Sequence, residues 1–562
     1  MEIHGMLYWK GAKPMIIVSS DFEAMVKSGL YVDKTGLICD LISLCGTGSS
    51  IIVNRPRRFG KSLSVSMIDA FFNADKPHLA SLFDGLEVSK NADALRLMHS
   101  HPVIRLSFSD ISDTKAFDPI LYLKSAIADQ YSLFENVVVS KLTKRESDEY
   151  ESILNLSAPW NFYLSALKKL TGFIHRATEK KPIVLIDEYD LLVEKYINKD
   201  EVGCVSSLKT IYSALLKDNP HLSFGFLTGV FSLAKGTLGS GLNNIPADNG
   251  IAALFKDNYF GFSEADVLGL LKKASVPASE LPRLAENYGG YVYYGKRYFN
   301  PWSILSFIAA RVYTPFWAIT ARDTLFSSLL QTHDGEKTIA ALIRGEEIYT
   351  QLDFSVSYED LHSSINNAMI YLFLAGYVSI RQVDFSTFVV RIPNKEARNA
   401  FELEIAKRYQ DKDGLDSLAK LKEAFQKGEE KEIELFLKSY LLSALSYYDL
   451  SNEKNYQIVI GTLAALLFGD SIVKFEVIEG EGRCDISISP KNEGGFGCVL
   501  EIKHYKDAIS SARLENGALS ALRQIKKNDY LEELKARKAN PLFAYGFAFH
   551  KKKVAITKEK IV

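Results

Sequence analysis

The stretch Asn54-Arg55-Pro56-Arg57-Arg58-Phe59-Gly60-Lys61-Ser62 directly follows the apolar run Ser50 to Val53. It has the spacing of a Walker A phosphate-binding loop, G-x-x-x-x-G-K-[ST], with Arg55 in place of the first glycine. A strand that ends in a tight turn and then enters a helix presents backbone N–H groups to phosphate oxygens. The stretch therefore predicts a strand, a nucleotide-binding loop and a helix over Leu63 to Phe72.

The residue types in this loop predict the contacts of an ATP site. Gly60 lets the backbone approach the phosphates, Lys61 reaches the β- and γ-phosphates, and Ser62 is a ligand of Mg²⁺. We count Arg57 and Arg58 with them as nucleotide-binding candidates. A Gly-Lys-Ser tripeptide is also common in surface turns, so the prediction needs a second motif.

That second motif is the apolar run Pro182 to Ile186, which ends in Asp187-Glu188-Tyr189-Asp190. A continuous apolar run with carboxylates at its end is typical of a buried parallel strand and a Walker B motif. We expect Asp187 to bind Mg²⁺ and Glu188 to polarise the attacking water. The alternative is an ordinary strand end that opens a helix, where Asp is a common cap.

A third apolar strand, Phe224 to Leu227, precedes Thr228-Gly229. We expect the Thr228 side chain to sense the γ-phosphate. The glycine-rich segment Gly236 to Asn244 follows, and by composition it is typical of a flexible connection.

Length and composition favour a cytoplasmic protein of several domains. The chain has 562 residues and a net charge of −1, and this length suggests about three to four domains. Five scattered cysteines without a C-x-x-C motif predict neither a disulfide framework nor a zinc site. The start of the chain lacks the pattern of a signal peptide, and the longest apolar run, Met369 to Ile380, is too short for a membrane span.

The C-terminal region is positively charged. Residues 502–562 carry fourteen Lys and Arg against six Asp and Glu, an excess of eight positive charges. Such an excess attracts a polyanion by counterion release. A solvated lysine-rich surface explains the charge equally well.

Two predicted strands bring carboxylates and a cation together in this region. Gly482 to Ile488 and Cys498 to Lys503 alternate with period two, which places Asp485 on one face of its strand and Glu501 with Lys503 on one face of the next. Asp485 and Glu501 suit Mg²⁺, and Lys503 would align or activate water, as in phosphodiester hydrolysis. The pattern is that of a PD-(D/E)xK nuclease core, and an ordinary edge hairpin remains the alternative.

Neighbouring elements agree with this core. Glu453 precedes a helical stretch, Tyr456 to Leu467, and would supply a further acid, while Ala518 to Leu534 is predicted as an amphipathic helix exposing Gln524. Tyr545 to Phe549 is predicted as a closing strand. The catalytic candidates of the whole chain are Glu188, Glu453, Asp485, Glu501, Lys503 and Gln524.

The central residues show no catalytic signature. Ser263 and the acids after it predict a helix start and a small helical lid, and the aromatic segment Tyr288 to Trp302 is better explained as a packed loop than as a base-stacking surface. A helix at Ser363 to Leu374, followed by strands at Gly376 to Ile380 and Phe388 to Ile392, predicts a winged helix. Residues 401–451 have helical spacing, and solvated helices explain them.

Seven short motifs lie in order along the chain: Tyr31-Val32-Asp33-Lys34-Thr35, residues 55–62, Asp187-Glu188-Tyr189-Asp190, Thr228-Gly229, Gly241-Leu242-Asn243-Asn244, Asn300-Pro301-Trp302-Ser303 and Gly482-Arg483-Cys484-Asp485. By these motifs the whole chain resembles a bacterial and archaeal family of AAA-ATPase-like proteins with a C-terminal PD-(D/E)xK nuclease-superfamily domain. The resemblance implies that Arg55 is normal in this loop and that the segment Gly241 to Asn244 belongs to the ATPase core. The family often has a basic residue near the position of Ser232, where only Lys235 is close, which implies slow hydrolysis.

The sequence thus predicts a multidomain α/β protein. It comprises a P-loop ATPase core (1–262), a helical lid and winged-helix region (263–400), a helical connector (401–451) and a nuclease-like domain of the restriction-endonuclease type (452–562). The leading hypothesis is an ATP- and Mg²⁺-dependent ATPase coupled to a nuclease acting on nucleic acid, with DNA favoured and a homo-oligomer allowed for. The alternative is a nucleotide-gated signalling or scaffold ATPase whose C-terminal domain binds nucleic acid or a protein without cutting.

Overall fold

The computed structural model describes residues 19–109, 117–196, 203–231, 245–251, 253–317, 333–354, 356, 360, 363–408, 414–444, 453–468, 471–479, 482–490, 493–507, 509–527 and 530–562. The chain divides into two compact units. The first comprises residues 1–321 and 349–397, and the second comprises residues 322–348 and 398–562.

The first unit is built on a parallel sheet in the order β2-β3-β4-β1-β5. Thr228 lies opposite both Val53 and Asp187, so the carboxyl ends of β1, β4 and β3 lie at one edge, where ligands bind in parallel α/β sheets. The predicted P-loop sheet is confirmed. Its strands are β1 (Ser50–Asn54), β2 (Val103–Ser107), β3 (Ile183–Asp187), β4 (Gly225–Gly229) and β5 (Ala247–Asp248).

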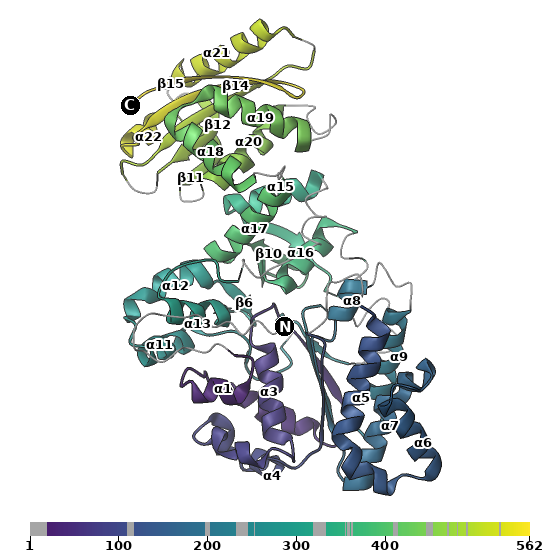
Figure 1. The fold of residues 1–562 in the computed structure, drawn as a ribbon. Coiled ribbons are helices and arrows are strands. Elements are labelled where there is room, and N and C mark those ends of the chain that lie inside the picture. Colours follow the sequence, from purple (N-terminus) through teal and green to yellow (C-terminus); the bar gives the residue numbers. More distant parts are fainter. Residues whose placement is uncertain are drawn as a thin grey trace. The chain divides into compact units, whose positions relative to one another are not determined.

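Helices cover both faces of this sheet (Figure 1). One face carries α1 (Phe22–Lys27), α2 (Gly36–Leu41), α3 (Lys61–Phe72) and α4 (Ala92–Leu97). The other face carries α5 (Pro119–Val138), α7 (Trp160–Thr178) and α9 (Cys204–Leu216), with α6 (Lys144–Leu154) packed on α5 and α7.

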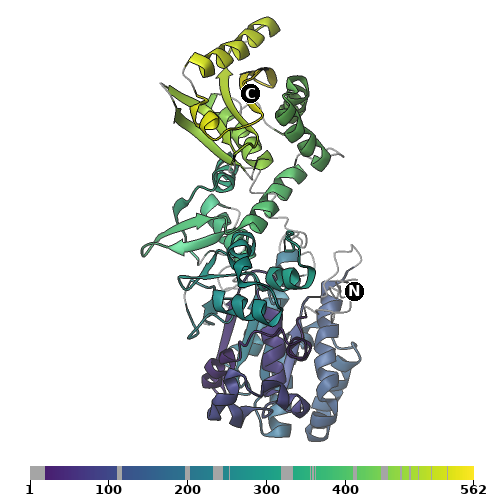
Figure 2. The same ribbon diagram turned by 90° about the vertical axis from the view of Figure 1, so that its left-hand side faces the viewer.

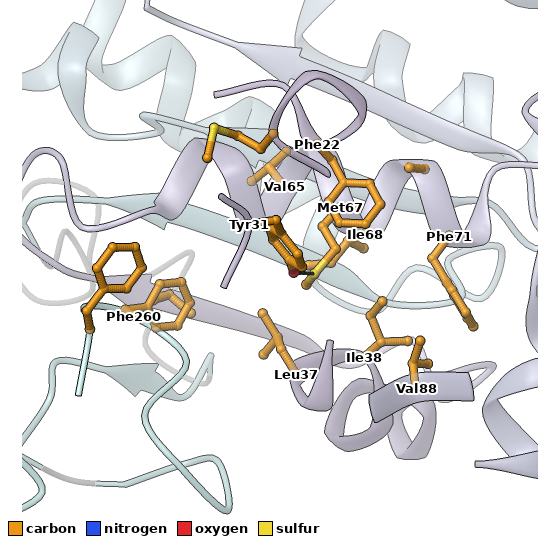
Figure 3. Packing of buried hydrophobic residues seen from close by; sticks show 14 of the residues in the cluster. Phe22, Tyr31, Leu37, Ile38, Val65, Met67, Ile68, Phe71, Val88 and Phe260 are labelled. Atoms are coloured by element: carbon orange, nitrogen blue, oxygen red, sulfur yellow. Dashed lines mark hydrogen bonds between the residues drawn. The ribbon is translucent and has the colours of Figure 1, made fainter. Parts of the chain in front are cut away.

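The main core of this unit joins α3 to the N-terminal segments (Figure 3). Phe22 stacks on Phe83 and meets Tyr31 edge to face. The Tyr31 hydroxyl donates to the Met67 sulfur at 3.2 Å, so the only polar atom of that ring has a partner inside the core. This packing fixes the helix that follows the phosphate loop.

A small helical subdomain follows the sheet. Ser263 and Asp266 form a reciprocal capping box at the start of α11, which confirms the predicted helix start, and Asp266 also pairs with Lys34 at 2.8 Å. Tyr291, Tyr293 and Tyr298 are buried, which confirms the packed-loop interpretation. The elements are α11 (Glu264–Lys273), α12 (Leu281–Tyr288), the hairpin β6 (Tyr291–Tyr293) and β7 (Lys296–Tyr298), and α13 (Pro301–Ala310).

A helix and wing are present where the sequence predicts them. The helix α16 (Ile365–Ala375) precedes the antiparallel strands β9 (Ser379–Gln382) and β10 (Thr387–Arg391), and the sheet order is β8-β10-β9 with β8 at Ile348–Gln351. The helix α17 (Lys395–Arg408) follows.

The second unit contains a sheet in the order β11-β12-β13-β14-β15, antiparallel except for the parallel pair β13–β14. Residues of α18, α19 and α20 share one apolar core with this sheet, and α21 and α22 pack on separate clusters with it. The sheet and these helices are the green to yellow ribbons in Figure 2. The strands are β11 (Ile472–Glu479), β12 (Gly482–Ser489), β13 (Gly497–His504), β14 (Leu542–His550) and β15 (Lys553–Lys560). The helices are α15 (His333–Arg344), α18 (Gly414–Lys427), α19 (Glu430–Ala444), α20 (Glu453–Leu467), α21 (Ser511–Lys527) and α22 (Glu532–Ala536).

Three predictions for this unit need correction. The helix expected at Ala518 to Leu534 begins at Ser511, because the Ser510 hydroxyl caps the Arg513 N–H, and it ends at Lys527. The closing strand is longer than predicted and extends over Leu542–His550. A further strand, β15, pairs with it, and the sequence pattern does not predict β15 because its lysines interrupt the apolar alternation. The helices α18 and α19 are not merely solvated, because Phe425, Ile433 and Leu437 lie in the core.

Close approach of α21 to the sheet depends on a small residue. A Cβ at Gly546 of β14 would lie 2.1 Å from the Ala518 carbonyl oxygen of α21. Only glycine fits at this position without moving backbone. The contact sets the distance between α21, which carries Gln524, and the strands beside it.

Among the described residues, no helix is long and apolar enough to cross a membrane.

Candidate functional sites

The phosphate loop connects β1 to α3 with the geometry of an anion site. Gly60 caps α3 with φ 89°, a left-handed conformation that favours glycine. Lys61 and Ser62 follow in the first helical turn, where backbone N–H groups lack helical partners. The N-terminus of α3, which carries a partial positive charge, therefore faces the space in front of the loop, where an anion can bind.

Lys61 is buried, and its ammonium donates to the carbonyl oxygens of Arg55 and Pro56 at 2.9 and 3.0 Å. Burial lowers its pKa, while the nearby carboxylates of Glu188, Asp187 and Asp190 act to raise it. The Walker A lysine and the acids after β3 therefore lie in one site, as the sequence predicts.

Arg55, which occupies the first glycine position, is fully buried and turned into the protein. Its guanidinium pairs with Asp248 at 2.8 Å and donates to the Tyr294 hydroxyl at 3.1 Å, and it is shielded from solvent. The charge also lies over the rings of Tyr293 and Phe260, at 5.1 and 5.2 Å. Burial lowers the pKa of Arg55, but Asp248, Tyr294 and Tyr293 together outweigh it and the net shift is upward. Arg55 thus anchors the loop to β5 and to the β6–β7 hairpin.

Arg57 and Arg58 have different surroundings. Arg57 Nη2 reaches both carboxylate oxygens of Glu194 at 3.4 Å. Arg58 has φ 69°, and its guanidinium lies over the Trp302 ring, 4.3 Å from the centroid. Burial lowers the pKa of Arg58, while the Glu188 carboxylate acts to raise it.

The acids after β3 are held by β4. Asp187 is buried and accepts the Thr228 hydroxyl and the Glu188 N–H, and Glu188 itself adopts a left-handed φ of 53°. Burial, and then Asp187, raise the pKa of Glu188. A raised pKa suits a carboxylate that takes a proton from water.

Asp190 fixes the turn after β4. Its carboxylate accepts the N–H groups of Val230 and Phe231 at 2.8 and 2.6 Å, and the Tyr189 hydroxyl donates to the Phe231 carbonyl at 2.7 Å. The positions of Ser232, Lys235 and the segment 236–244 lie outside the described residues.

The second site lies where β12 and β13 pair. Their register places Ile486 opposite Leu500, so Asp485 and Glu501 are the next opposed pair. Asp485 accepts the Ile502 N–H and the Gln457 amide, each at 2.7 Å. Glu453, the first residue of α20, accepts the His504 N–H at 3.1 Å.

Glu501 and Lys503 meet Gln524 from α21. The Gln524 amide donates to Glu501 and its carbonyl accepts the Lys503 ammonium at 2.6 Å, while Lys503 lies 3.5 Å from Glu501. The structure therefore brings together all five C-terminal candidates, from α20, β12, β13 and α21. Gln524 is half-buried and bonded rather than simply exposed.

The negative charges of the carboxylates in this site have few partners that stabilise them. Burial raises the pKa of Asp485 to about 6 and that of Glu501 to about 7, and the negative neighbours Glu453 and Asp485 add to these shifts. The Glu501 Oε2 atom is buried without a hydrogen-bond partner. A cation would satisfy this oxygen and restore the ordinary charge of both groups.

The described residues contain no group of three or more His, Cys, Asp or Glu side chains that could hold a metal ion. A pair of carboxylates still fits Mg²⁺, which usually keeps several waters and takes one or two carboxylates plus substrate phosphate. Asp485 and Glu501 would be such a pair.

Several contributing residues escaped the sequence interpretation. Gln457 contacts Asp485, Asp248 and Tyr294 hold Arg55, and Trp302 lies against Arg58. Trp302 stands in a motif that carries the family resemblance, and Gln457 lies in the predicted helix Tyr456 to Leu467, but neither residue had an assigned role. Asp248 carries no local pattern that could have identified it.

Comparison with known proteins divides the chain in the same way. Residues 16–238 match the family described as "Predicted AAA-ATPase" (AAA-ATPase-like), and residues 451–559 match the PD-(D/E)XK nuclease superfamily. A protein of Azotobacter chroococcum mcd 1, described as an uncharacterized protein in the vnfD 5′ region, is 29% identical over 393 residues, covering 67% of each chain. The resemblance inferred from the sequence is confirmed for these two domains.

Proposed function

We propose that this chain, which combines an AAA-ATPase-like domain with a PD-(D/E)XK nuclease-superfamily domain, binds and hydrolyses ATP to control metal-dependent cleavage of nucleic acid. The observation that carries the proposal is that Asp485, Lys503 and Gln524 lie around Glu501, whose Oε2 atom is buried without a hydrogen-bond partner. A buried carboxylate oxygen without a partner destabilises the folded state, which supports a site that a cation completes.

In the first domain, the side chains and backbone of the protein itself bind ATP and activate the attacking water. The α3 N-terminus and Lys61 bind phosphate oxygens, and Ser62 with Asp187 would hold Mg²⁺, which supplies charge neutralisation when bound. Thr228 orients Asp187 by a hydrogen bond. Glu188 accepts a proton from the attacking water, and its raised pKa makes this transfer easier.

In the second domain, Asp485 and Glu501 would hold Mg²⁺, which polarises the phosphodiester when bound. Lys503 orients the attacking water and neutralises developing charge, and Gln524 fixes the Lys503 ammonium beside Glu501. Glu453 is held by the His504 N–H at the start of α20, beside this pair.

Nucleic acid is the proposed substrate, and DNA the favoured form. The sequence of 502–562, with fourteen basic and six acidic residues, supports a polyanionic ligand. The second candidate is a domain that binds nucleic acid without cutting it, and the positive charge of residues 502–562 supports this candidate equally.

A cleavage assay separates the two candidates. Full-length protein is incubated with ATP and either Mg²⁺ or EDTA on single-stranded DNA, duplex DNA and RNA. The nuclease proposal predicts metal-dependent products from at least one substrate. If all three stay intact while one is bound, the binding candidate replaces it.

A further inference from the structure

The turn between β14 and β15 carries three consecutive lysines. His550 pairs with Lys553, so Lys551 and Lys552 form a two-residue turn between the strands. Lys551 has φ 51°, a left-handed conformation for which asparagine, aspartate or glycine is usual in such turns. The geometry of the turn therefore does not explain a lysine at this position, and a backbone outlier of this kind points to a function.

The sheet places this turn at the same edge as the second site. The strands β13 and β14 are parallel, and Lys503 lies opposite Ala548. Lys551 is three residues beyond Ala548, a distance of about 10 Å along the strand at about 3.3 Å per residue. The Tyr505 N–H, just after β13, donates to the Phe549 carbonyl at 2.9 Å, so the two chains leave the sheet together. The lysine turn therefore lies directly beyond the strand end that carries Lys503.

The helix α20 holds both the turn and an acid of the site. The Tyr456 ring is buried and stacks on Phe549, with 4.5 Å between the ring centroids, and its hydroxyl donates to the Lys551 carbonyl at 2.8 Å. The next residue, Gln457, donates to Asp485 at 2.7 Å. The position of the lysine turn relative to a candidate metal ligand is therefore fixed by contacts within the fold.

The charge of the second site gives the lysine turn a task. The acids of the site, when ionised, repel the phosphates of a nucleic acid strand. The Lys503 ammonium lies 2.6 Å from Gln524 and 3.5 Å from Glu501, so its charge is directed into the site. Lys551 and Lys553 are exposed at the border of the site. Exposed cations at the border of an acidic site attract a polyanion and release its counterions.

We propose that the turn Lys551-Lys552-Lys553 binds the sugar-phosphate backbone of the substrate strand, beside the bond that is cut. The inference rests on the proposed function, because it requires nucleic acid as the ligand of the second domain. Duplex DNA advances about 3.4 Å per nucleotide of each strand, so a separation of about 10 Å corresponds to about three nucleotides. Phosphates carry no sequence information, so this contact holds the strand whatever its base sequence.

The test measures binding of the full-length protein to short fluorescent oligonucleotides of single-stranded DNA, duplex DNA and RNA, in EDTA and over a range of salt concentrations. Lys551→Gln/Lys553→Gln removes two charges and keeps the backbone carbonyl that Tyr456 contacts. Each lost phosphate contact lowers the slope of log Kobs against log salt by about 0.7 for a single strand and about 0.9 for a duplex. The double variant should lower this slope by about 1.4 or about 1.8, and weaken binding by roughly tenfold or more at low salt.

The matched control is Lys535→Gln/Lys538→Gln, which removes the same charge from two exposed lysines of the same unit. Lys538 lies near the opposite end of β13, because its carbonyl accepts the Gly494 N–H just before that strand. This control should leave Kd and the salt slope almost unchanged. Lys551→Arg/Lys553→Arg keeps both charges and should bind as the wild type does. Thermal unfolding checks that each variant folds with the wild-type Tm.

Two results would overturn the inference. One is wild-type Kd and salt slope in Lys551→Gln/Lys553→Gln, and the other is an equal loss of affinity in both Gln variants, which would show a general effect of net charge. A wild type that binds none of the oligonucleotides overturns nucleic acid as the ligand, and the inference with it. Binding that is weakened only in the turn variant supports the inference even where the wild type cuts no substrate in Mg²⁺, in which case the proposed nuclease activity alone fails.

Discussion

The two sites each place carboxylates of β-strands, or of the residues directly after a strand, beside a lysine, but they differ in the hydrogen bonds that those carboxylates accept. In the first site, Lys61 donates to loop carbonyls, Asp187 accepts Thr228, and Asp190 accepts two backbone N–H groups. In the second site, Glu501 retains a buried oxygen without a partner. The carboxylates of the first site are held by hydrogen bonds within the protein, whereas we propose that a cation completes the second site.

The two sites share raised carboxyl pKa values. Burial raises the pKa of Glu188 in the first site, and in the second site it raises the pKa of Asp485 to about 6 and that of Glu501 to about 7. A divalent cation, which we propose for both sites, would restore the ordinary charge of these groups.

The largest expected effect is the loss of cleavage on changing Asp485. Asp485→Ala should lower cleavage by roughly a thousandfold, because a metal ligand is lost and Lys503 has no organised metal partner. It should also abolish the Mg²⁺-induced rise in the Tm of the C-terminal unit. Glu493→Ala, at an exposed carboxylate that pairs with Lys538, is the control. Cleavage retained by Asp485→Ala would place the metal elsewhere.

Next in size is the effect of Arg55 on folding. Arg55→Ala leaves Asp248 buried without its cation, which should cost about 3–5 kcal/mol of stability. Lys296→Ala, in an exposed pair with Asp257, should change little. Thermal unfolding followed by circular dichroism measures both. Arg55→Gly places the usual glycine of the Walker A motif in the loop. A higher nucleotide affinity in this variant would show that Arg55 weakens nucleotide binding.

A smaller but specific effect is expected on nucleotide affinity. Lys61→Ala should weaken ATP binding by about a hundredfold, because each hydrogen bond to a charged group contributes about 1.5–3 kcal/mol. Titration of a fluorescent ATP analogue measures it, with Lys27→Ala, an exposed lysine of α1, as the control. An unchanged Kd would move the nucleotide away from this loop.

The smallest expected effect concerns a buried acid of the first unit that lies in neither site. Burial raises the pKa of Glu396 from 4.5 to about 7, so the folded protein keeps a proton that the unfolded chain loses between these values. Stability therefore falls as pH rises from about 4.5 to about 7, by at most about 3 kcal/mol. Glu396→Gln should raise the Tm at pH 8 and leave it unchanged at pH 4.

The control for this measurement is Glu286→Gln, at an exposed glutamate that pairs with Lys395. A Glu396→Gln Tm gain of equal size at both pH values would show that proton uptake is not involved.

The elements around the chemistry were predictable because short motifs fix them. Gly60, Lys61 and the apolar runs before Asn54 and Asp187 each define a local structure, and the order of strands and helices follows. The period-two alternation of the two strands was likewise enough to predict that Asp485 lies near Glu501 and Lys503.

The remaining features depend on contacts between distant residues. Arg55 pairs with Asp248, which lies 193 positions later in the chain, and no local sequence pattern relates the two residues. The lysine-rich β15 has its apolar face concealed by charged neighbours, and α18 and α19 bury theirs only against the sheet. Roles for the candidate residues stay predictions.

The central claim is that ATP at the first site controls cleavage at the second. The most direct measurement is the cleavage rate with and without ATP, at fixed Mg²⁺, for the wild type and Lys61→Ala. The account predicts that ATP changes the wild-type rate and leaves the variant's rate unchanged. Equal rates with and without ATP in an active wild type would contradict it.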